Sequence, residues 1–220
     1  MTRPLIITDC DEVLLHMLVP FREWADEVHD LHFDFDRLKF ADALRHKESD
    51  EPVTRELVWT LLTAFFDDEM HRQTPIDGSM EALARLSAMA DIVVLTNIDE
   101  RHRQGRVEQL AGHGLTAPVF CNHGGKGPPL AKIVADRSPS VALFIDDIAE
   151  HHASVAEHAP GVWRLHMVGE PELHDRIPPA DMAHARIDRW AQAEAWIAAR
   201  LAEGPAPDDS PLAMEPNDEH

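Results

Sequence analysis

Short runs of apolar residues alternate along most of this chain with longer segments in which apolar residues recur every three or four positions. The short runs are rich in β-branched residues and have the length of strands that are buried on both faces of a sheet. They occupy residues 4–8, 91–96, 118–121, 141–146 and 162–168. The longer segments have the period of amphipathic helices, and they occupy residues 75–90, 99–114, 128–137, 146–161 and 188–204. This alternation predicts an α/β fold with a Rossmann-like open parallel sheet and right-handed crossovers.

Residues 14–74 interrupt the alternation, and the segment is much longer than an ordinary connection in an α/β unit. Two parts of it, 17–32 and 51–70, have the apolar spacing of amphipathic helices, and the whole segment 14–74 contains most of the aromatic residues of the chain. We expect these aromatic side chains to form mainly the core of the segment. The pattern predicts a small all-helical cap domain at 14–74, inserted into a catalytic core made of residues 1–13 and 75–203.

The chain is strongly acidic, with 20 Lys and Arg against 40 Asp and Glu and a formal net charge of −20. Nucleic-acid polymers and anionic membrane surfaces would repel such a protein, so neither is an expected partner. A small anionic substrate stays compatible with this charge, because one lysine or one metal ion can reverse the potential inside a single cleft. Residues 204–220 are rich in proline and acidic residues and are expected to form a disordered acidic tail.

The number of cysteines and the length of the apolar runs indicate the cellular compartment in which the protein is expected. Cys10 and Cys121 are the two cysteines, too few for a disulfide framework, which favours the reducing cytoplasm. No secretory signal is apparent at the amino terminus, and no apolar run approaches the length of a membrane span. The sequence does not indicate an oligomeric state.

Polar side chains gather where the predicted strands end. Because the carboxyl ends of parallel strands meet in one crevice, we expect these side chains to converge there; they are Asp9, Asp11, Thr96, Asn97, Asp146 and Asp147, together with Lys126 from the loop before the helix at 128–137. Two like charges at the tip of a buried strand are unfavourable unless a cation offsets them. Several carboxylates in one crevice form an oxygen-rich site of the kind that binds Mg²⁺. The alternative for most of these residues is a helix cap or a solvated side chain.

A cation, an ammonium group and a hydroxyl together suit a bound phosphoryl group, whose transfer depends mainly on charge and position. With the repulsion offset, Asp9 could attack phosphorus and form an aspartyl phosphate. Asp11, two residues later, could serve as general acid to the leaving oxygen and then as general base to water. Strand alternation directs Cys10 away from the two aspartates.

The order D-x-D-x-V after the first strand, Thr after the second, Lys before the fourth and D-D after the fourth resembles the haloacid dehalogenase-like (HAD) superfamily of phosphohydrolases. The resemblance implies that Asp9 is the nucleophile and a Mg²⁺ ligand. It implies that Asp11 is the acid/base and binds Mg²⁺ through its main-chain carbonyl. A helical cap inserted after the first strand is also similar to members of this superfamily.

The resemblance assigns the remaining residues to two groups. The phosphate would be bound by Thr96 and Lys126, and the Mg²⁺ site would be completed by Asp146 and Asp147. Asn97, which follows Thr96 at the same strand end, is expected to bind the phosphate as well. Glu12 departs from the pattern, because glycine is frequent at that position in the family; its carboxylate could narrow the choice of substrate or face the solvent.

The expected activity is hydrolysis of a small phosphorylated metabolite. The sequences "DEVL" and "FREWADEV" also resemble, more loosely, the 5'-nucleotidase branch of the superfamily. Two alternatives stay open: a phosphotransferase or mutase of sugar phosphates with the same site, and a non-catalytic HAD-like binding protein. The fifteen histidines show no H-E-x-x-H spacing, and we expect His151 and His152 to lie at the surface.

Overall fold

The computed structural model describes residues 2–35, 37 and 40–207, and its centre is a six-stranded parallel sheet. The strand order is β5-β4-β1-β6-β7-β8, and the strands are β1 (Leu5–Thr8), β4 (Asp91–Thr96), β5 (Val119–Cys121), β6 (Ala142–Asp146), β7 (Trp163–His166) and β8 (Ala185–Arg186). The predicted parallel α/β sheet is therefore confirmed. Only β8 was missed, because a strand of two residues is too short to give a periodic pattern.

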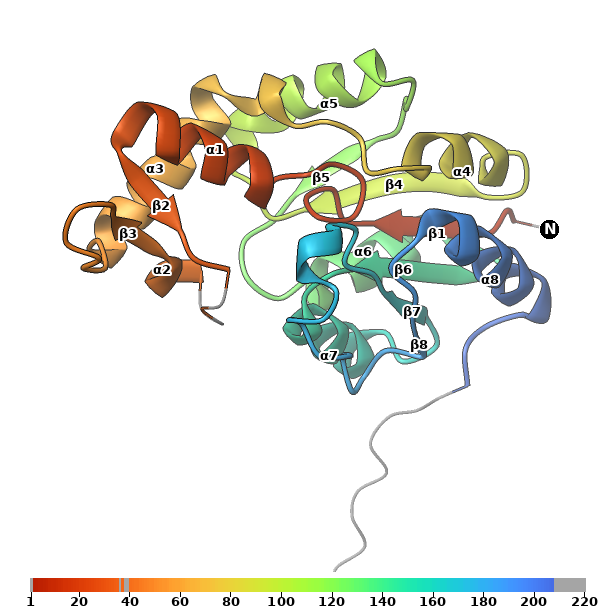
Figure 1. Cartoon of the computed structure of the whole chain (residues 1–220). Coiled ribbons are helices and arrows are strands. Elements are labelled where there is room, and N and C mark those ends of the chain that lie inside the picture. Colours follow the sequence, from red (N-terminus) through yellow and green to blue (C-terminus); the bar gives the residue numbers. More distant parts are fainter. Residues whose placement is uncertain (1, 36, 38–39, 208–220) are drawn as a thin grey trace, which may run out of the picture.

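Helices cover both faces of this sheet, because its strands are apolar on both sides (Figure 1). Ile6 points to one face, where it packs in a cluster with residues of α4 (Ser79–Leu86) and α8 (Trp190–Glu203). Leu5 and Ile7 point to the other face, where they pack with residues of α6 (Gly127–Arg137) and α7 (Ala149–His158). This arrangement confirms a Rossmann-like core in which the central strand, β1, is completely buried.

The insert, residues 14–74, contains two principal helices, α1 (Leu18–His29) and α3 (Arg55–Asp68), close to the two that were predicted. The expectation that it is all helical is wrong, because it also contains a short antiparallel hairpin. The smaller elements are β2 (Leu31–Phe33), α2 (Phe40–Ala43), β3 (Leu44–His46) and the 3-10 helix η1 (Met70–Arg72). The buried side chains of Leu31, Phe33 and Leu44 bring the hairpin into the aromatic cluster of the insert. A three-residue strand is too short for its alternation to be recognised in the sequence.

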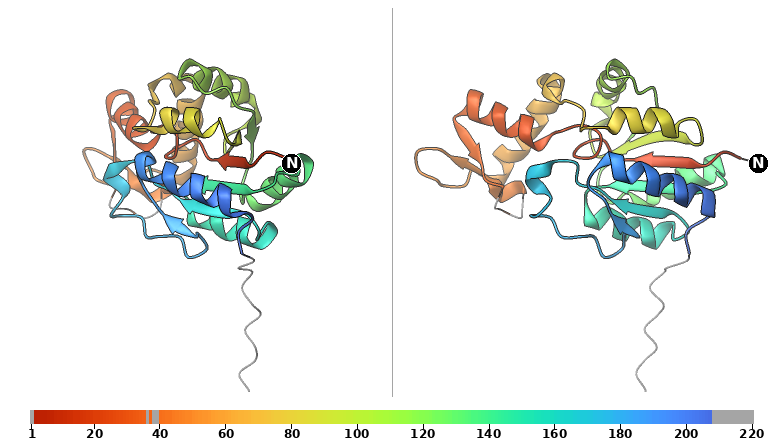
Figure 2. Two further views of the ribbon diagram at one scale, coloured as in Figure 1. Left: turned by 90° about the vertical axis from the view of Figure 1, so that its right-hand side faces the viewer. Right: turned by 45° about the vertical axis from the view of Figure 1, so that its right-hand side comes forward.

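Two linkers join the insert to the core, and they lie side by side. The N–H of His16 donates to Thr74 O at 2.9 Å, and the N–H of Ile76 donates to Leu14 O at 2.9 Å. The entry linker starts directly after β1, so the insert stands at the carboxyl end of the sheet (Figures 1 and 2). In an open α/β sheet this is the end where ligands bind.

The remaining core elements follow the predicted ranges, with shorter helices. The segment 99–114 forms a 3-10 turn, η2 (Glu100–His102), followed by α5 (Arg103–Gly112), and the 3-10 turn η3 (Pro171–Leu173) follows β7. Within the described residues, no helix is both long and apolar enough to cross a membrane. The expected disordered tail falls largely on 208–220, outside the described residues.

Candidate active site at the carboxyl end of the sheet

Three of the predicted site residues come together because their strands are neighbours. β1 lies between β4 and β6, and Asp9, Thr96 and Asp146 stand at the carboxyl ends of these three strands. The N–H of Asp9 donates to Ile145 O at 2.8 Å, which continues the sheet one residue beyond β1. Asp9, Thr96 and Asp146 are all buried.

Lys126 joins this group from the start of α6. Its Nζ lies 2.7 Å from Asp9 Oδ1 and 2.7 Å from Asp146 Oδ2, and the side chain is completely buried. Burial alone would lower the pKa of Lys126, but the Asp146 and Asp9 carboxylates more than offset burial and hold that pKa above its usual value. Lys126 therefore supplies one permanent positive charge between two carboxylates.

Asp147 adds a third carboxylate to the two that face Lys126. One carboxylate oxygen from each of Asp9, Asp146 and Asp147 can be chosen so that the three lie within 4.8 Å of one another. Burial raises the pKa of Asp9 although Lys126 opposes this, and burial together with Asp146 and Asp9 raises the pKa of Asp147. The site thus has three carboxylate groups and one positively charged ammonium group. Because the carboxylates offer oxygen ligands, the site fits a hard cation such as Mg²⁺.

The two adjacent aspartates differ in what they contact. Asp146 Oδ2 binds Lys126, and its Oδ1 accepts the N–H of Ile148 at 2.9 Å. Asp147 is partly exposed toward the solvent. Asp147 is therefore better placed than Asp146 to bind a cation directly.

Asp11 lies apart from this carboxylate group and is held by two buried residues. Arg106 Nη2 in α5 donates to both oxygens of Asp11, at 2.9 and 3.1 Å, and Gln73 Nε2 in the exit linker donates to Oδ1 at 2.6 Å. Phe66 of the insert lies over the Arg106 guanidinium, 5.8 Å from it. The sequence analysis missed Arg106 and Gln73, because neither one follows a strand or belongs to a recognisable motif.

The residues expected to bind phosphate differ in their hydrogen-bond partners. Thr96 Oγ1 is buried and has no hydrogen-bond partner among the described atoms. The Asn97 side chain donates to Gly124 O at 2.9 Å and accepts from Asn122 Nδ2 at 2.9 Å, so it holds the loop that leads to Lys126. An unsatisfied buried hydroxyl is unfavourable, so the Thr96 hydroxyl is available to donate a hydrogen bond to a group bound beside it.

Glu12 is buried, so of the two alternatives left open for its carboxylate, the one in which it faces the solvent is wrong. Its backbone has φ of 59°, a left-handed conformation that glycine adopts most readily. Its Oε1 accepts the N–H groups of Met17 at 2.8 Å and Leu18 at 2.6 Å, which caps the start of α1. Burial raises the pKa of Glu12 to about 7 in spite of these two bonds. This residue thus connects the turn after β1 to the first helix of the insert.

His151 and His152 were expected at the surface, and both are buried. His152 Nε2 lies 3.0 Å from Asp146 O, and His166 Nε2 lies 2.8 Å from Asp147 O. The N–H of Ala180 donates to His166 Nδ1, so the proton of that ring is on Nε2. Burial lowers the pKa of His152 to about 3 and also lowers that of His166. Two neutral imidazoles therefore hold the backbone of the loop that carries Asp146 and Asp147.

Cys10 is also buried, and burial raises the pKa of its thiol. Arg106 Nη1 lies 3.2 Å from its Sγ. A thiol in this environment stays protonated and is a poor nucleophile.

No protein-family model matches the chain, and no curated protein is significantly similar to it in sequence. Solved structures do share its fold. A haloacid dehalogenase-like family hydrolase from Streptococcus pneumoniae is 12% identical with a TM-score of 0.62, over 90% of this chain and 98% of that chain. A HAD-superfamily hydrolase of subfamily IA from Geobacter sulfurreducens is 17% identical with a TM-score of 0.57, over 89% and 96%. A D,D-heptose bisphosphate phosphatase from B. bronchiseptica, complexed with magnesium and phosphate, is 14% identical with a TM-score of 0.53, over 89% and 98%. This chain has the fold of the HAD-like hydrolases.

Proposed function

We propose that this chain is a Mg²⁺-dependent phosphohydrolase that cleaves small phosphomonoesters through an aspartyl phosphate on Asp9. The observation that carries the proposal is the buried Lys126, held between Asp9 and Asp146 beside the unpartnered hydroxyl of Thr96. A phosphoryl group placed there would meet a nucleophile, a cation and a hydrogen-bond donor at once.

The carboxylates in this crevice have different proposed roles. When bound, Mg²⁺ would be held by the carboxylates of Asp9 and Asp147 and the main-chain carbonyl of Asp11, and it would offset charge on the phosphoryl oxygens. Asp146 holds Lys126, which in turn faces both Asp9 and the substrate phosphate. Thr96 donates its free hydroxyl to a phosphoryl oxygen.

The reaction has two steps that use the same pair of aspartates. An oxygen of Asp9 attacks phosphorus while Asp11 gives a proton to the departing alkoxide, which leaves as an alcohol. Asp11 then accepts a proton from water, whose oxygen attacks phosphorus and releases phosphate from Asp9. Arg106 and Gln73 orient the Asp11 carboxylate for both transfers.

The insert at 14–74 acts in this proposal as a cap over a core formed by 1–13 and 75–203. It stands at the carboxyl end of the sheet, and its linkers carry Gln73 to the Asp11 carboxylate. A 5'-nucleotide is the first substrate class to examine, because of the local resemblance around the first aspartates. Transfer to a sugar hydroxyl instead of water is the second candidate, since a sugar hydroxyl could give its proton to Asp11 and attack phosphorus in the second step as water does.

The experiment measures phosphate release from p-nitrophenyl phosphate and from a panel of phosphomonoesters led by 5'-nucleotides, with Mg²⁺ and with EDTA. We expect turnover with Mg²⁺ that EDTA abolishes and that Asp9→Asn lowers by at least about a thousandfold, because the nucleophile is lost. Asp136→Asn is the matched control, since Asp136 is an exposed partner of Lys132 on α6.

Equal activity in wild type and Asp9→Asn would contradict the aspartyl-phosphate mechanism. Loss of substrate without release of inorganic phosphate would favour the transferase over the hydrolase. An inactive wild type that also fails to bind Mg²⁺ would favour the non-catalytic binding protein.

A further inference from the structure

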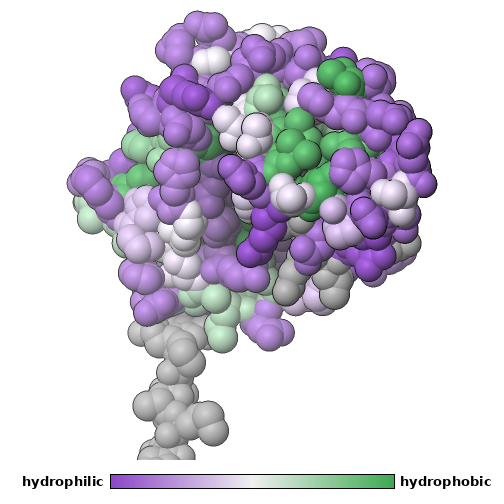
Figure 3. All heavy atoms as spheres, turned by 90° about the vertical axis from the view of Figure 1, so that its left-hand side faces the viewer, coloured by the Kyte–Doolittle hydropathy of each residue, from purple (hydrophilic) through white to green (hydrophobic). Residues whose placement is uncertain are grey.

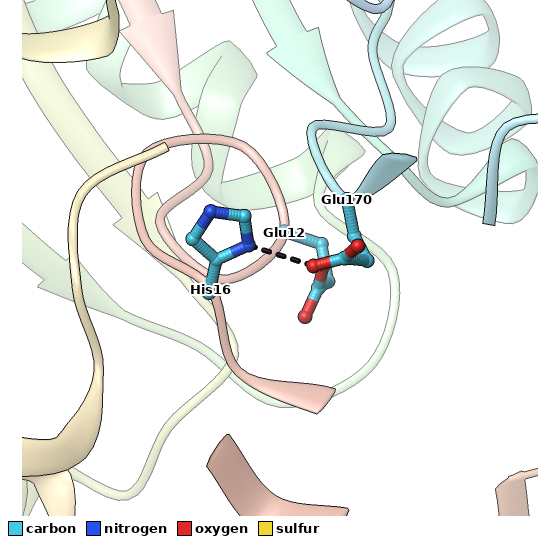
Figure 4. A group of neighbouring side chains, drawn as sticks. All are labelled: Glu12, His16 and Glu170. Atoms are coloured by element: carbon cyan, nitrogen blue, oxygen red, sulfur yellow. Dashed lines mark hydrogen bonds and ion pairs between the residues drawn. The ribbon is translucent and has the colours of Figure 1, made fainter. Parts of the chain in front are cut away.

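A second group of ionisable side chains lies outside the Asp9 site, where the entry linker meets the core (Figure 4). Glu12 and His16 lie at the two ends of the turn between β1 and α1, and Glu170 lies in the loop after β7. One possible ligand atom from each of the three side chains lies within 4.8 Å of the other two. None of these residues is needed by the proposed reaction.

Two carboxylates are buried together in this group. Glu12 is 2% exposed and Glu170 is 5% exposed, and Figure 4 shows their carboxylate groups facing each other. His16 Nδ1 lies 2.8 Å from Glu170 Oε2. The two carboxylates therefore share one buried site with a single imidazole, and like charges in a buried site are unfavourable without compensation.

The contacts of Glu12 identify the atom that lacks a partner. Its Oε1 accepts two backbone N–H groups at the start of α1. Its Oε2 is buried and accepts no hydrogen bond from the described atoms. Glu170 is arranged in a similar way, because its Oε1 accepts the N–H of Glu172 at 3.0 Å while Oε2 faces His16. Each carboxylate therefore has one oxygen fixed by the backbone and one oxygen directed into the cluster.

We propose that Glu12, His16 and Glu170 form a binding site for a divalent transition-metal ion such as Zn²⁺, separate from the Mg²⁺ site. An imidazole nitrogen with two carboxylate oxygens suits Zn²⁺ or Mn²⁺ better than Mg²⁺, which prefers oxygen ligands throughout. Ligand atoms on one zinc ion lie roughly 3 to 3.5 Å apart, given bonds of about 2.1 Å, so the cluster is close to the required spacing. The neutral imidazole of His16 with its proton on Nε2 would offer the lone pair of Nδ1 to the ion.

An ion at this position would fix the cap to the core. Glu12 caps α1, the first helix of the insert, and His16 belongs to the entry linker, whereas Glu170 belongs to the core. The same core loop already holds α1 through Glu172, whose carboxylate binds Arg22 at 2.8 and 3.1 Å. The expected role of the ion is therefore structural.

The test is zinc binding to the full chain, stripped with EDTA and then studied by calorimetry in buffer with millimolar Mg²⁺. We expect one high-affinity zinc equivalent in wild type. His16→Ala and Glu170→Gln should each weaken its affinity by at least about tenfold, because each removes one of three protein ligands. Asp147→Asn should retain it, which keeps the result independent of the proposed phosphatase.

His113→Ala is the matched control, since His113 is a partly exposed histidine at the end of α5. Zinc should also raise the melting temperature of wild type and of His113→Ala but not that of His16→Ala. Circular dichroism verifies that each variant is folded. Zinc binding that is absent from wild type, or equally strong in His16→Ala and Glu170→Gln, would overturn the proposal.

Discussion

Thr8 and Thr96 end two neighbouring strands, and they differ in one contact. Thr8 Oγ1 donates to Asp9 O at 2.8 Å, whereas Thr96 Oγ1 is buried without a partner. We expect Thr96→Val to stabilise the protein by up to about 2 kcal/mol, because valine removes an unsatisfied hydroxyl at nearly constant volume. The same change should lower kcat/KM by roughly 10- to 100-fold, because a hydrogen bond to a charged phosphoryl group is lost. Chemical denaturation and steady-state kinetics measure the two effects.

Thr8→Val is the control for the stability arm. It removes a hydrogen bond that exists, so we expect it to destabilise the protein by about 1 kcal/mol. Inhibition by inorganic phosphate gives a third measurement, and Thr96→Val should weaken it. Unchanged phosphate inhibition in Thr96→Val would contradict the assignment of this hydroxyl to the phosphate.

The sequence predicted part of the site because strand ends are readable. Asp9, Thr96 and Asp146 each follow a recognisable apolar run, and parallel pairing alone brings such ends together. Arg106 and Glu170 carry no comparable signal, because Arg106 lies within a helix and Glu170 in a loop that tertiary packing brings to the linker. Glu12 illustrates the same limit: its position was known, but its burial depends on α1 and on the loop after β7.

At the scale of elements, α6 and α7 pack so closely that one glycine is required between them. A Cβ on Gly127 would overlap the backbone carbonyl of Ser154. The N–H of Gly127 also donates to Ser154 Oγ at 3.0 Å. This contact fixes the start of α6, where Lys126 enters the site.

We expect Gly127→Ala to destabilise the protein by about 1 to 3 kcal/mol, because the overlap forces the two helices apart. It should also lower activity, since Lys126 moves with the end of the helix. Gly105→Ala is the control, because a Cβ at Gly105 in α5 meets nothing within 4 Å. Alanine should stabilise that helix by about 1 kcal/mol. Denaturation midpoints compare the two variants, and equal effects would contradict the packing argument.

Elements long enough to show a period were predicted well, and short ones were not. The helices α1 and α3 of the insert follow from the spacing of residues such as Trp24 and Phe65. Each strand of the hairpin, β2 and β3, has three residues, which is too few to show an alternation in the sequence. The hairpin is buried because the aromatic cluster packs around it. In a segment of this kind, packing decides the structure more than local pattern does.

At the scale of the whole molecule, the insert has an apolar cluster of its own, separate from the two apolar clusters on the faces of the sheet, and polar contacts join the insert to the core. The cluster of the insert shares no residue with the clusters of the sheet among the described residues. The exposed large apolar side chains of the insert include Val28, Leu57 and Trp59. Figure 3 views this end of the molecule and shows apolar surface surrounded by hydrophilic residues. Separate cores joined by polar contacts favour movement of one part relative to the other.

Asp67 of α3 makes a polar contact between the insert and the core: its oxygens lie 3.0 Å from Arg101 Nη2 and 2.7 Å from His102 Nε2. We expect Asp67→Asn to raise KM by roughly fivefold, because a partly exposed contact worth about 1 kcal/mol then no longer holds the insert, the proposed cap, against the core. Hydrogen exchange should increase in the linker peptide 69–76, while the free energy of global unfolding changes little. Glu194→Gln is the matched control, since Glu194 pairs with Arg85 at 2.7 Å within the core alone. If Asp67→Asn and Glu194→Gln gave the same KM and the same linker exchange, this contact would have no part in closing the cap, and closure would depend on the linkers themselves.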